Sequence, residues 1–231
     1  MFLLIHHFTL ISDGTFFCVT KFIVVLLIFK DVNPTGMPEL AFEKIRTNVV
    51  DKLKKLDPHL TYHSIDHTLD VVNQAQRIAA EEGITDERDL FLLKVAALYH
   101  DSGFLETYKD HEKISYDIFL RDASGSEFTE DDKNIIRGLI LSTKIPQQPK
   151  THMEKIICDA DLDYLGRSDF LQIGDALRRE FTFYKVVSND QEWEKLQLNF
   201  LQNHKYHTKT SQKQREPVKH QHYSKLIADS H

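Results

Sequence analysis

Three separate segments of the chain carry an imidazole or a carboxylate at positions where a helical pattern calls for an apolar side chain. These residues are His67, the adjacent pair His100 and Asp101, and Asp161. His67 shares a helical stripe with Val71 and Ala75. Asp161 shares another stripe with Ile157. Because such stripes face the core of a globular protein, all four polar side chains are predicted to point inward.

Two buried carboxylates need a compensating positive charge. An isolated ionised carboxylate in an apolar environment costs several kcal/mol or takes up a proton instead. No Lys or Arg lies on the stripes that carry Asp101 and Asp161. Two imidazoles and two carboxylates together suit a divalent cation such as Mn, Mg, Fe or Zn. The four residues are therefore predicted to bind a divalent metal ion.

A further histidine, His63, precedes His67 by one helical turn. Zinc peptidases also place two histidines at this spacing, but their motif needs Glu directly after the first one, and Ser64 stands there. We interpret His63 as a general acid, because an imidazole with a pKa near 6.5 exchanges protons at neutral pH. A water made more acidic by the metal is the predicted nucleophile, and Asp101 is predicted to orient it.

The elements that position these residues are predicted to be helices. From residue 37 onward, apolar residues recur with a helical period, and no alternating strand pattern with hairpin turns appears. Helices are expected over residues 39–56, 65–82, 87–100, 111–121, 130–141, 152–164, 169–184, 191–204 and 210–228. Turn residues such as Gly83, Gly125 and Pro146 separate these segments. The predicted fold class is all-α, a single bundle of about eight or nine helices.

Length and charge restrict the classes of partner. At 231 residues with 41% hydrophobic content, the chain can bury one core, and a second full domain would be a tight fit. A formal net charge of -6 argues against a nucleic acid polymer as partner. Cys18 and Cys158 form no CxxC pair, which disfavours a disulfide scaffold and favours a reducing cytoplasm.

Two terminal segments differ in composition from the rest. Residues 1–36 are apolar, but polar residues interrupt every window of spanning length, so no stable membrane span is expected. We interpret this segment as an over-extended gene start upstream of Met37, with a weak interfacial anchor as the alternative. Residues 206–231 are polar and basic and are expected to form a solvated terminal helix, with a lid or phosphate-facing role as the alternative. The predicted domain occupies residues 37–205.

The order of the four predicted ligands resembles the H…HD…D signature of the HD superfamily of metal-dependent phosphohydrolases. The flanking sequence is similar as well: AALYHDSGF resembles the end of that family's HD helix, and ICDADLDYLG resembles its final-aspartate segment. The position of the family's ligand in that segment implies Asp161 rather than Asp159. The resemblance covers roughly residues 62–170 and implies an HD-type helical bundle.

This resemblance implies hydrolysis of a small phosphate mono- or diester, with a nucleotide as the expected substrate. The YHxxxH segment from Tyr62 to His67 is similar to that of cyclic-nucleotide phosphodiesterases, where the first His is a general acid and the second a metal ligand. Two alternatives stay open. One is a metal-containing protein that senses a nucleotide without turnover, and the other is an oxygenase with a di-iron site on an HD fold.

Four further residues are candidates for the site. His111 resembles the position at which some HD proteins bind a second metal ion, although the tandem histidine expected later is missing from GLILSTKIP. A polar residue at a helix N-terminus is the alternative for His111. Lys144, Arg167 and His204 are basic and are candidates for contact with substrate phosphate, with structural or solvated roles as the alternative.

Overall fold

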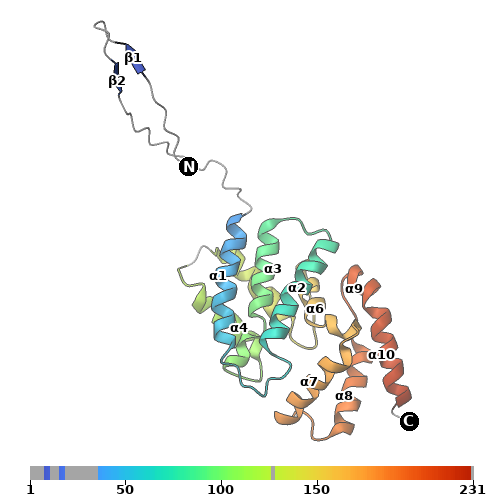
Figure 1. The fold of residues 1–231 in the computed structure, drawn as a ribbon. Coiled ribbons are helices and arrows are strands. Elements are labelled where there is room, and N and C mark those ends of the chain that lie inside the picture. The colour runs from blue at the N-terminus through green and yellow to red at the C-terminus, as the bar shows by residue number, and fades with distance from the viewer. Residues whose placement is uncertain (1–7, 11–15, 19–35, 126–127, 230–231) are drawn as a thin grey trace. The chain divides into compact units, whose positions relative to one another are not determined.

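The protein is described by a computed structural model, shown in Figure 1. The described residues are 8–10, 16–18, 36–125 and 128–229. The chain divides into two compact units, Met1–Pro34 and Thr35–His231. In the first unit, β1 (Phe8–Leu10) pairs antiparallel with β2 (Phe16–Cys18). The interpretation of residues 1–36 as an over-extended gene start falls mostly outside the described residues and stays a prediction.

The second unit is helical throughout its described part, which confirms the all-α prediction (Figure 1). Its elements are α1 (Gly36–Leu53), α2 (Ile65–Glu81), α3 (Glu87–Tyr99), η1 (Ser102–Leu105), α4 (His111–Asp122), α5 (Glu130–Ser142), α6 (His152–Asp161), η2 (Asp163–Gly166), α7 (Phe170–Phe183), α8 (Asp190–Asn203), α9 (Lys209–Gln214) and α10 (Glu216–Asp229), where η1 and η2 are short 3-10 helices. The expected helix over residues 210–228 is divided into α9 and α10. Pro217 explains the division, because proline has no backbone N–H and suits the first turn of a new helix. Among the described residues, no helix combines the length and apolar character needed to cross a membrane.

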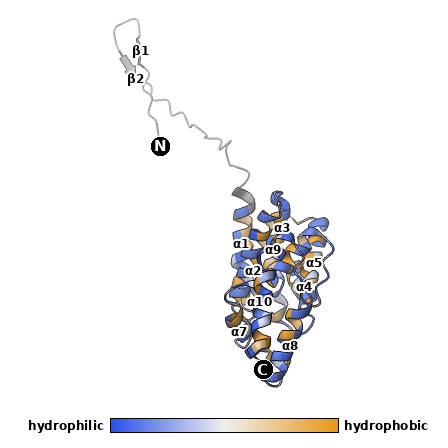
Figure 2. Cartoon of the chain, turned by 90° about the vertical axis from the view of Figure 1, so that its right-hand side faces the viewer, coloured by the Kyte–Doolittle hydropathy of each residue, from blue (hydrophilic) through white to orange (hydrophobic). Residues whose placement is uncertain are grey.

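Helix α3 forms the centre of the main core. Every residue from Phe91 to Tyr99 is buried, and α1, α2 and α5 pack around this helix. The stripe predicted on α2 is also buried, with Val71 at 1% and Ala75 and Ile78 at 0% exposure. Figure 2 shows hydrophobic and hydrophilic residues mixed within single helices, as expected for helices that bury one face. The hydrophobic periodicity therefore identified the inward faces that carry the polar residues.

The C-terminal segment packs against η2, which corrects the expectation of a solvated terminal helix. The Tyr206 hydroxyl donates a hydrogen bond to the Leu162 carbonyl oxygen at 3.1 Å. The Lys219 side chain is fully buried, and its ammonium is paired with Glu216 at 2.6 Å. Helix α10 packs on both η2 and α8 (Figure 1). A polar segment is thus part of the folded unit, because its charges are paired inside the protein.

A close approach between η1 and α4 holds the segment that follows His100. The Gly103 N–H donates to Ser115 Oγ at 2.8 Å, and this hydroxyl donates to the His100 carbonyl oxygen at 2.7 Å. A Cβ atom on Gly103 would overlap with the His111 carbonyl oxygen and lie 2.7 Å from its carbonyl carbon. Both atoms belong to the backbone, so neither can move aside cheaply. Only glycine fits between these two elements.

We expect Gly103→Ala to lower the free energy of unfolding by about 2 kcal/mol or more, because the backbone of α4 must shift to admit the methyl group. Urea denaturation monitored by circular dichroism measures this loss. Gly138→Ala on α5 is the matched control, since its Cβ would meet only the end of the flexible Glu154 side chain. Equal stabilities of the two variants would contradict the packing described for Gly103.

Candidate metal centre

The four predicted ligands converge on one point in the structure. Nε2 of His67, in the first turn of α2, lies 3.3 Å from Asp101 Oδ2 and 3.3 Å from Asp161 Oδ1. Nε2 of His100, at the end of α3, lies 3.1 Å and 3.6 Å from the same two oxygens. Asp161 is the last residue of α6. Two helix ends and one helix start therefore bring together residues that are up to 94 positions apart, from 67 to 161.

The spacing of these atoms fits a single cation. Donor atoms bonded to one ion at about 2.0–2.2 Å lie about 3.0–3.5 Å from each other. The His67 and His100 Nε2 atoms and Asp101 Oδ2 are buried and have no hydrogen-bond partner among the described residues. Buried polar atoms without a partner are rare in folded proteins, so three that face one another point to a bound group. The residues present therefore fit a divalent metal ion.

A hydrogen bond from the far side of the ring orients His100, and a helix cap holds the backbone of His67. His100 Nδ1 lies 2.7 Å from the Ala97 carbonyl oxygen, so it carries the proton and donates it there. The lone pair of His100 is then on Nε2, which faces the two carboxylates. At the start of α2, Ser64 Oγ accepts a hydrogen bond from the His67 backbone N–H at 3.4 Å and fixes the first helical turn. Local hydrogen bonds thus hold the two segments from which the imidazoles extend.

Mutual electrostatics make the centre a strong cation site. Burial lowers the pKa of His67, but the Asp101 and Asp161 carboxylates outweigh it and raise this pKa to about 9. Burial raises the pKa of Asp161, but His100 and His67 outweigh it and lower this pKa to about 2. The two carboxylates therefore stabilise a positive charge at this point, which is carried either by protonated imidazoles or by a metal ion that replaces those protons.

We expect binding of a divalent cation to chelator-treated protein to release protons at neutral pH, because the ion must displace the proton that a His67 pKa of about 9 retains. The part of the release that comes from His67 should fade above about pH 9, where this imidazole is already deprotonated. Calorimetric titration with Mn²⁺ in buffers of different ionisation enthalpy counts the protons. A count of zero at neutral pH would contradict this competition.

His63 lies beside the centre and is paired with a buried carboxylate. Its Nδ1 lies 2.5 Å from Glu180 Oε1, and the Glu180 side chain is fully buried. The other oxygen, Oε2, accepts the backbone N–H groups of Tyr62 and His63 at 2.9 and 3.1 Å. Burial raises the pKa of Glu180, but His63 and these amides outweigh it and lower the pKa below its usual value. Glu180 is therefore ionised at neutral pH and orients the imidazole.

Sequence reasoning missed Glu180, although the signal that found the ligands was present. Glu180 lies on the α7 stripe that carries Ile173 and Leu177, where an apolar residue is expected. Its partner His63 is 117 residues away in sequence, so no local pattern connects them.

His111 reaches the second oxygen of Asp101. Its Nε2 lies 3.2 Å from Asp101 Oδ1 and 3.8 Å from Glu112 Oε1. The Phe104 ring stacks on both His111 and His63, with centroids 3.9 Å and 4.2 Å away, and the two imidazole centroids lie 6.1 Å apart. His111 therefore lies next to the centre, and its role as a ligand for a second metal stays a prediction.

The three basic candidates have different surroundings. Lys144 lines the pocket that opens onto the centre, and its ammonium is paired with Asp110. The Arg167 guanidinium is held by Asp169 and Asp70, each at 2.6 Å, and lines another pocket, which contains His67 and Asp161. Phosphate binding by these residues stays a prediction.

His204 lies in a different environment from Lys144 and Arg167. Burial and the nearby Lys219 lower the pKa of His204 to about 3, so it carries no charge at neutral pH. A neutral imidazole gives little attraction to phosphate, which weakens the prediction made for this residue.

Asp159, the other carboxylate of the final-aspartate segment, has a structural partner. Its oxygens accept the backbone N–H groups of His207 and Thr208, both at 2.8 Å, and the Thr208 hydroxyl at 2.7 Å. Asp159 therefore ties α6 to the segment before α9, and its geometry supports the choice of Asp161 as the ligand.

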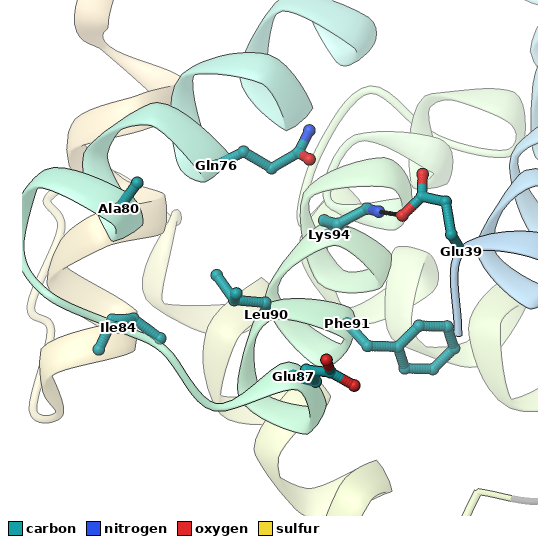
Figure 3. A pocket seen from close by; sticks show the side chains of 8 residues that line it. All are labelled: Glu39, Gln76, Ala80, Ile84, Glu87, Leu90, Phe91 and Lys94. Carbon is teal, nitrogen blue, oxygen red and sulfur yellow. Dashed lines mark hydrogen bonds and ion pairs between the residues drawn. The ribbon is translucent and has the colours of Figure 1, made fainter. Parts of the chain in front are cut away.

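Another pocket lies away from the centre, between α1, α2 and α3. Figure 3 shows Lys94 pointing toward Glu39, and these side chains are paired at 2.6 Å. The Lys94 ammonium also lies 4.0 Å from the centre of the Phe42 ring. Among the described residues, no histidine lines this pocket.

Comparison with known proteins agrees with this geometry. Residues 64–163 match the family model of the HD domain. Bacillus subtilis YpgQ, solved in complex with ADP, is 23% identical, with a TM-score of 0.57 over 84% of this chain and 97% of that chain. A predicted HD superfamily hydrolase from an uncultured Thermotogales bacterium is 21% identical, with a TM-score of 0.52 over 82% and 92%. A protein from Lactobacillus plantarum is 17% identical, with a TM-score of 0.54 over 83% and 97%.

No curated protein matches the chain. The matched region contains all four converging residues and the end of the helix that carries the adjacent His and Asp. Residues 64–163 of this chain thus match the HD domain, and the helical fold around them is similar to that of the three solved structures.

Proposed function

We propose that this protein is a metal-dependent phosphohydrolase that cleaves a small phosphate ester, with nucleotides as its substrate class. The observation that carries the proposal is the convergence of two imidazoles and two carboxylates beside a histidine that a buried glutamate orients. A protein that bound a nucleotide without turnover would need only the converging imidazoles and carboxylates, and not the pair of His63 and Glu180. The proposal therefore rests on both groups together.

The chain supplies a holder for the metal and a proton donor. His67, His100, Asp101 and Asp161 would hold the ion. A divalent ion bound there supplies Lewis acidity to a phosphoryl oxygen and makes a water more acidic. His63 lies in the wall of the same pocket, close enough to give a proton to the oxygen that leaves phosphorus.

The hydrolysis is balanced with these groups alone. The water oxygen forms a bond to phosphorus, the bond from phosphorus to the leaving oxygen breaks, and that oxygen takes its proton from His63. Glu180 keeps the His63 Nδ1 proton in place, so the opposite nitrogen is the one that faces the pocket. The attacking water gives up a proton to solvent, and solvent returns a proton to His63, so the reaction consumes one water and no net proton.

Two observations support a nucleotide as substrate. YpgQ, which shares the fold, was solved in complex with ADP. In this chain, a pocket of about 650 Å³ opens onto the centre, a size that suits an organic group larger than phosphate. Both observations favour an ester of a nucleoside over a small inorganic substrate.

The test is hydrolysis by the full chain of nucleoside mono- and triphosphates, cyclic nucleotides and an aryl phosphodiester, with added Mn²⁺, Mg²⁺ or a chelator. We expect release of product that depends on the metal and stops with the chelator. Absence of turnover of every substrate by protein shown to contain metal would overturn the proposal in favour of nucleotide sensing. Metal-dependent consumption of oxygen would favour the oxygenase alternative instead.

A further inference from the structure

The lining of the pocket that opens onto the centre contains two unlike groups of residues. One group is polar and includes His63, Asp101 and Asp161. The other group consists of apolar side chains of α7 and α8, which we call the apolar wall: Phe170, Leu177, Phe181, Trp193, Leu196 and Phe200. The polarity of the pocket therefore changes from the metal ligands to the helices that follow η2.

Charge is absent from the half of the pocket that contains the apolar wall. In the described part of the chain, none of the lining residues from Leu162 to Leu201 is charged. The lysines that line the pocket, Lys109 and Lys144, come from other segments, and Lys144 is already paired with Asp110. A phosphate group buried against the apolar wall would lose its hydration without gaining a cation, which is costly. The part of a substrate that lies there must be uncharged.

The apolar wall is rich in aromatic rings, which a flat ligand can stack on. Trp193 is buried, and its ring meets the ring of Phe181 edge to face, with centroids 6.0 Å apart. Rings held in this way offer stacking surfaces to a flat ligand. Gln197, next to Leu196, also lines the pocket. Its side-chain amide can donate a hydrogen bond to heteroatoms at the edge of a ring, or accept one from them.

We propose that the organic part of the substrate is a flat, uncharged ring system of nucleobase size that lies against the apolar wall while its phosphate lies at the metal centre. This inference rests on the proposed function for the position of the phosphate. It makes the base the main determinant of specificity. Sugar phosphates and inorganic polyphosphates, which lack the ring, are then poor ligands.

Binding can be measured apart from turnover. Trp193 is the one tryptophan of the sequence and belongs to the apolar wall, so its fluorescence should change when a ligand binds against that wall. The full chain, loaded with Mn²⁺, is titrated with adenosine monophosphate, ribose phosphate and an alkyl phosphate of similar size. We expect adenosine monophosphate to bind at least about tenfold more tightly than ribose phosphate. Equal affinities, or tighter binding of the alkyl phosphate, would overturn the assignment of a ring to the wall.

A pair of leucine variants on α8 tests the wall itself. Leu196→Glu places a charge in the wall, whereas Leu198→Glu places the same charge on the same helix beside a different pocket. We expect Leu196→Glu to weaken adenosine monophosphate at least about tenfold and to leave ribose phosphate unchanged, with Leu198→Glu close to wild type for both. Circular dichroism confirms that both variants are folded. Equal behaviour of the two variants would contradict the inference.

The two proposals fail in different ways. Selective binding of adenosine monophosphate without hydrolysis of any nucleotide would leave the role of the apolar wall intact and overturn the proposed function. Metal-dependent hydrolysis of adenosine monophosphate and ribose phosphate with equal kcat/KM would support the proposed function and overturn the role of the apolar wall.

Discussion

Asp161→Asn is expected to remove both the bound metal and the turnover, whereas Asp159→Asn keeps both. Asp161 Oδ1 lies 3.3 Å and 3.6 Å from the two ligand histidines, so the variant places a neutral amide where the cation needs an anion. Loss of a residue that only supports a ligand costs about 10–100-fold in metal affinity, and loss of the ligand itself should cost at least as much. Elemental analysis of the dialysed proteins and hydrolysis assays measure the two effects.

Asp159 is a close control because it lies two residues earlier on the same helix. Its carboxylate accepts three hydrogen bonds from His207 and Thr208, so its replacement should lower the free energy of unfolding by about 1–3 kcal/mol instead. Asp101→Ala is expected to behave like Asp161→Asn, because Asp101 Oδ2 lies within 3.3 Å of both ligand histidines. If Asp161→Asn retained the metal and Asp159→Asn lost it, Asp159 would be the ligand and Asp161 the structural residue, which would contradict the assignment.

His63→Ala should keep the metal and lose about 10²–10⁴-fold in kcat, the usual contribution of a general acid. The His63 and His67 ring centroids are 6.0 Å apart, and His63 has no atom among those that converge on the centre. Single-turnover kinetics and metal analysis separate the two properties. His59→Ala is the control, because His59 is half exposed and stacks on Phe183 away from the centre. Equal loss of metal in His63→Ala and Asp101→Ala would contradict this division of roles.

Glu180→Gln tests how His63 is positioned. A neutral amide holds the imidazole less firmly than a carboxylate does, so kcat should fall while KM and the bound metal stay close to wild type. A residue that served only the packing of α7 would lower stability without this selective loss of kcat. Glu180→Asp, which keeps the charge, should restore part of the lost kcat.

Burial periodicity indicated which polar residues come together at the candidate metal centre. His67 and His100 each replace an apolar residue on a stripe whose other members are buried, and the same is true of Asp161. Such substitutions are costly unless something compensates them, so they stand out against an apolar pattern. The predicted helix over residues 152–164 was too long, because η2 interrupts the helical hydrogen bonding after Asp161.

The C-terminal segment escaped prediction for the opposite reason. Besides the apolar packing of Tyr206, it makes buried polar contacts: Arg215 Nε donates to the buried Asp163 carboxylate at 2.8 Å, and Arg77 donates to the same oxygen at 2.8 Å. Hydrophobic periodicity detects apolar burial and has no signal for a pair of opposite charges brought together over 52 or more residues. The same limitation hid the pairing of Glu180 with His63.

The burial of this C-terminal segment has a consequence for the order of events during biosynthesis. The turn that carries Asp161 is flanked by Asp159, Asp163 and Gly166, and each of these contacts the stretch from Tyr206 to Arg215. A nascent chain that has emerged from the ribosome only as far as Leu201 already contains every predicted ligand, but it lacks the partners of Asp159 and Gly166. The contacts around the last predicted ligand are therefore completed late in translation, after Arg215 has emerged.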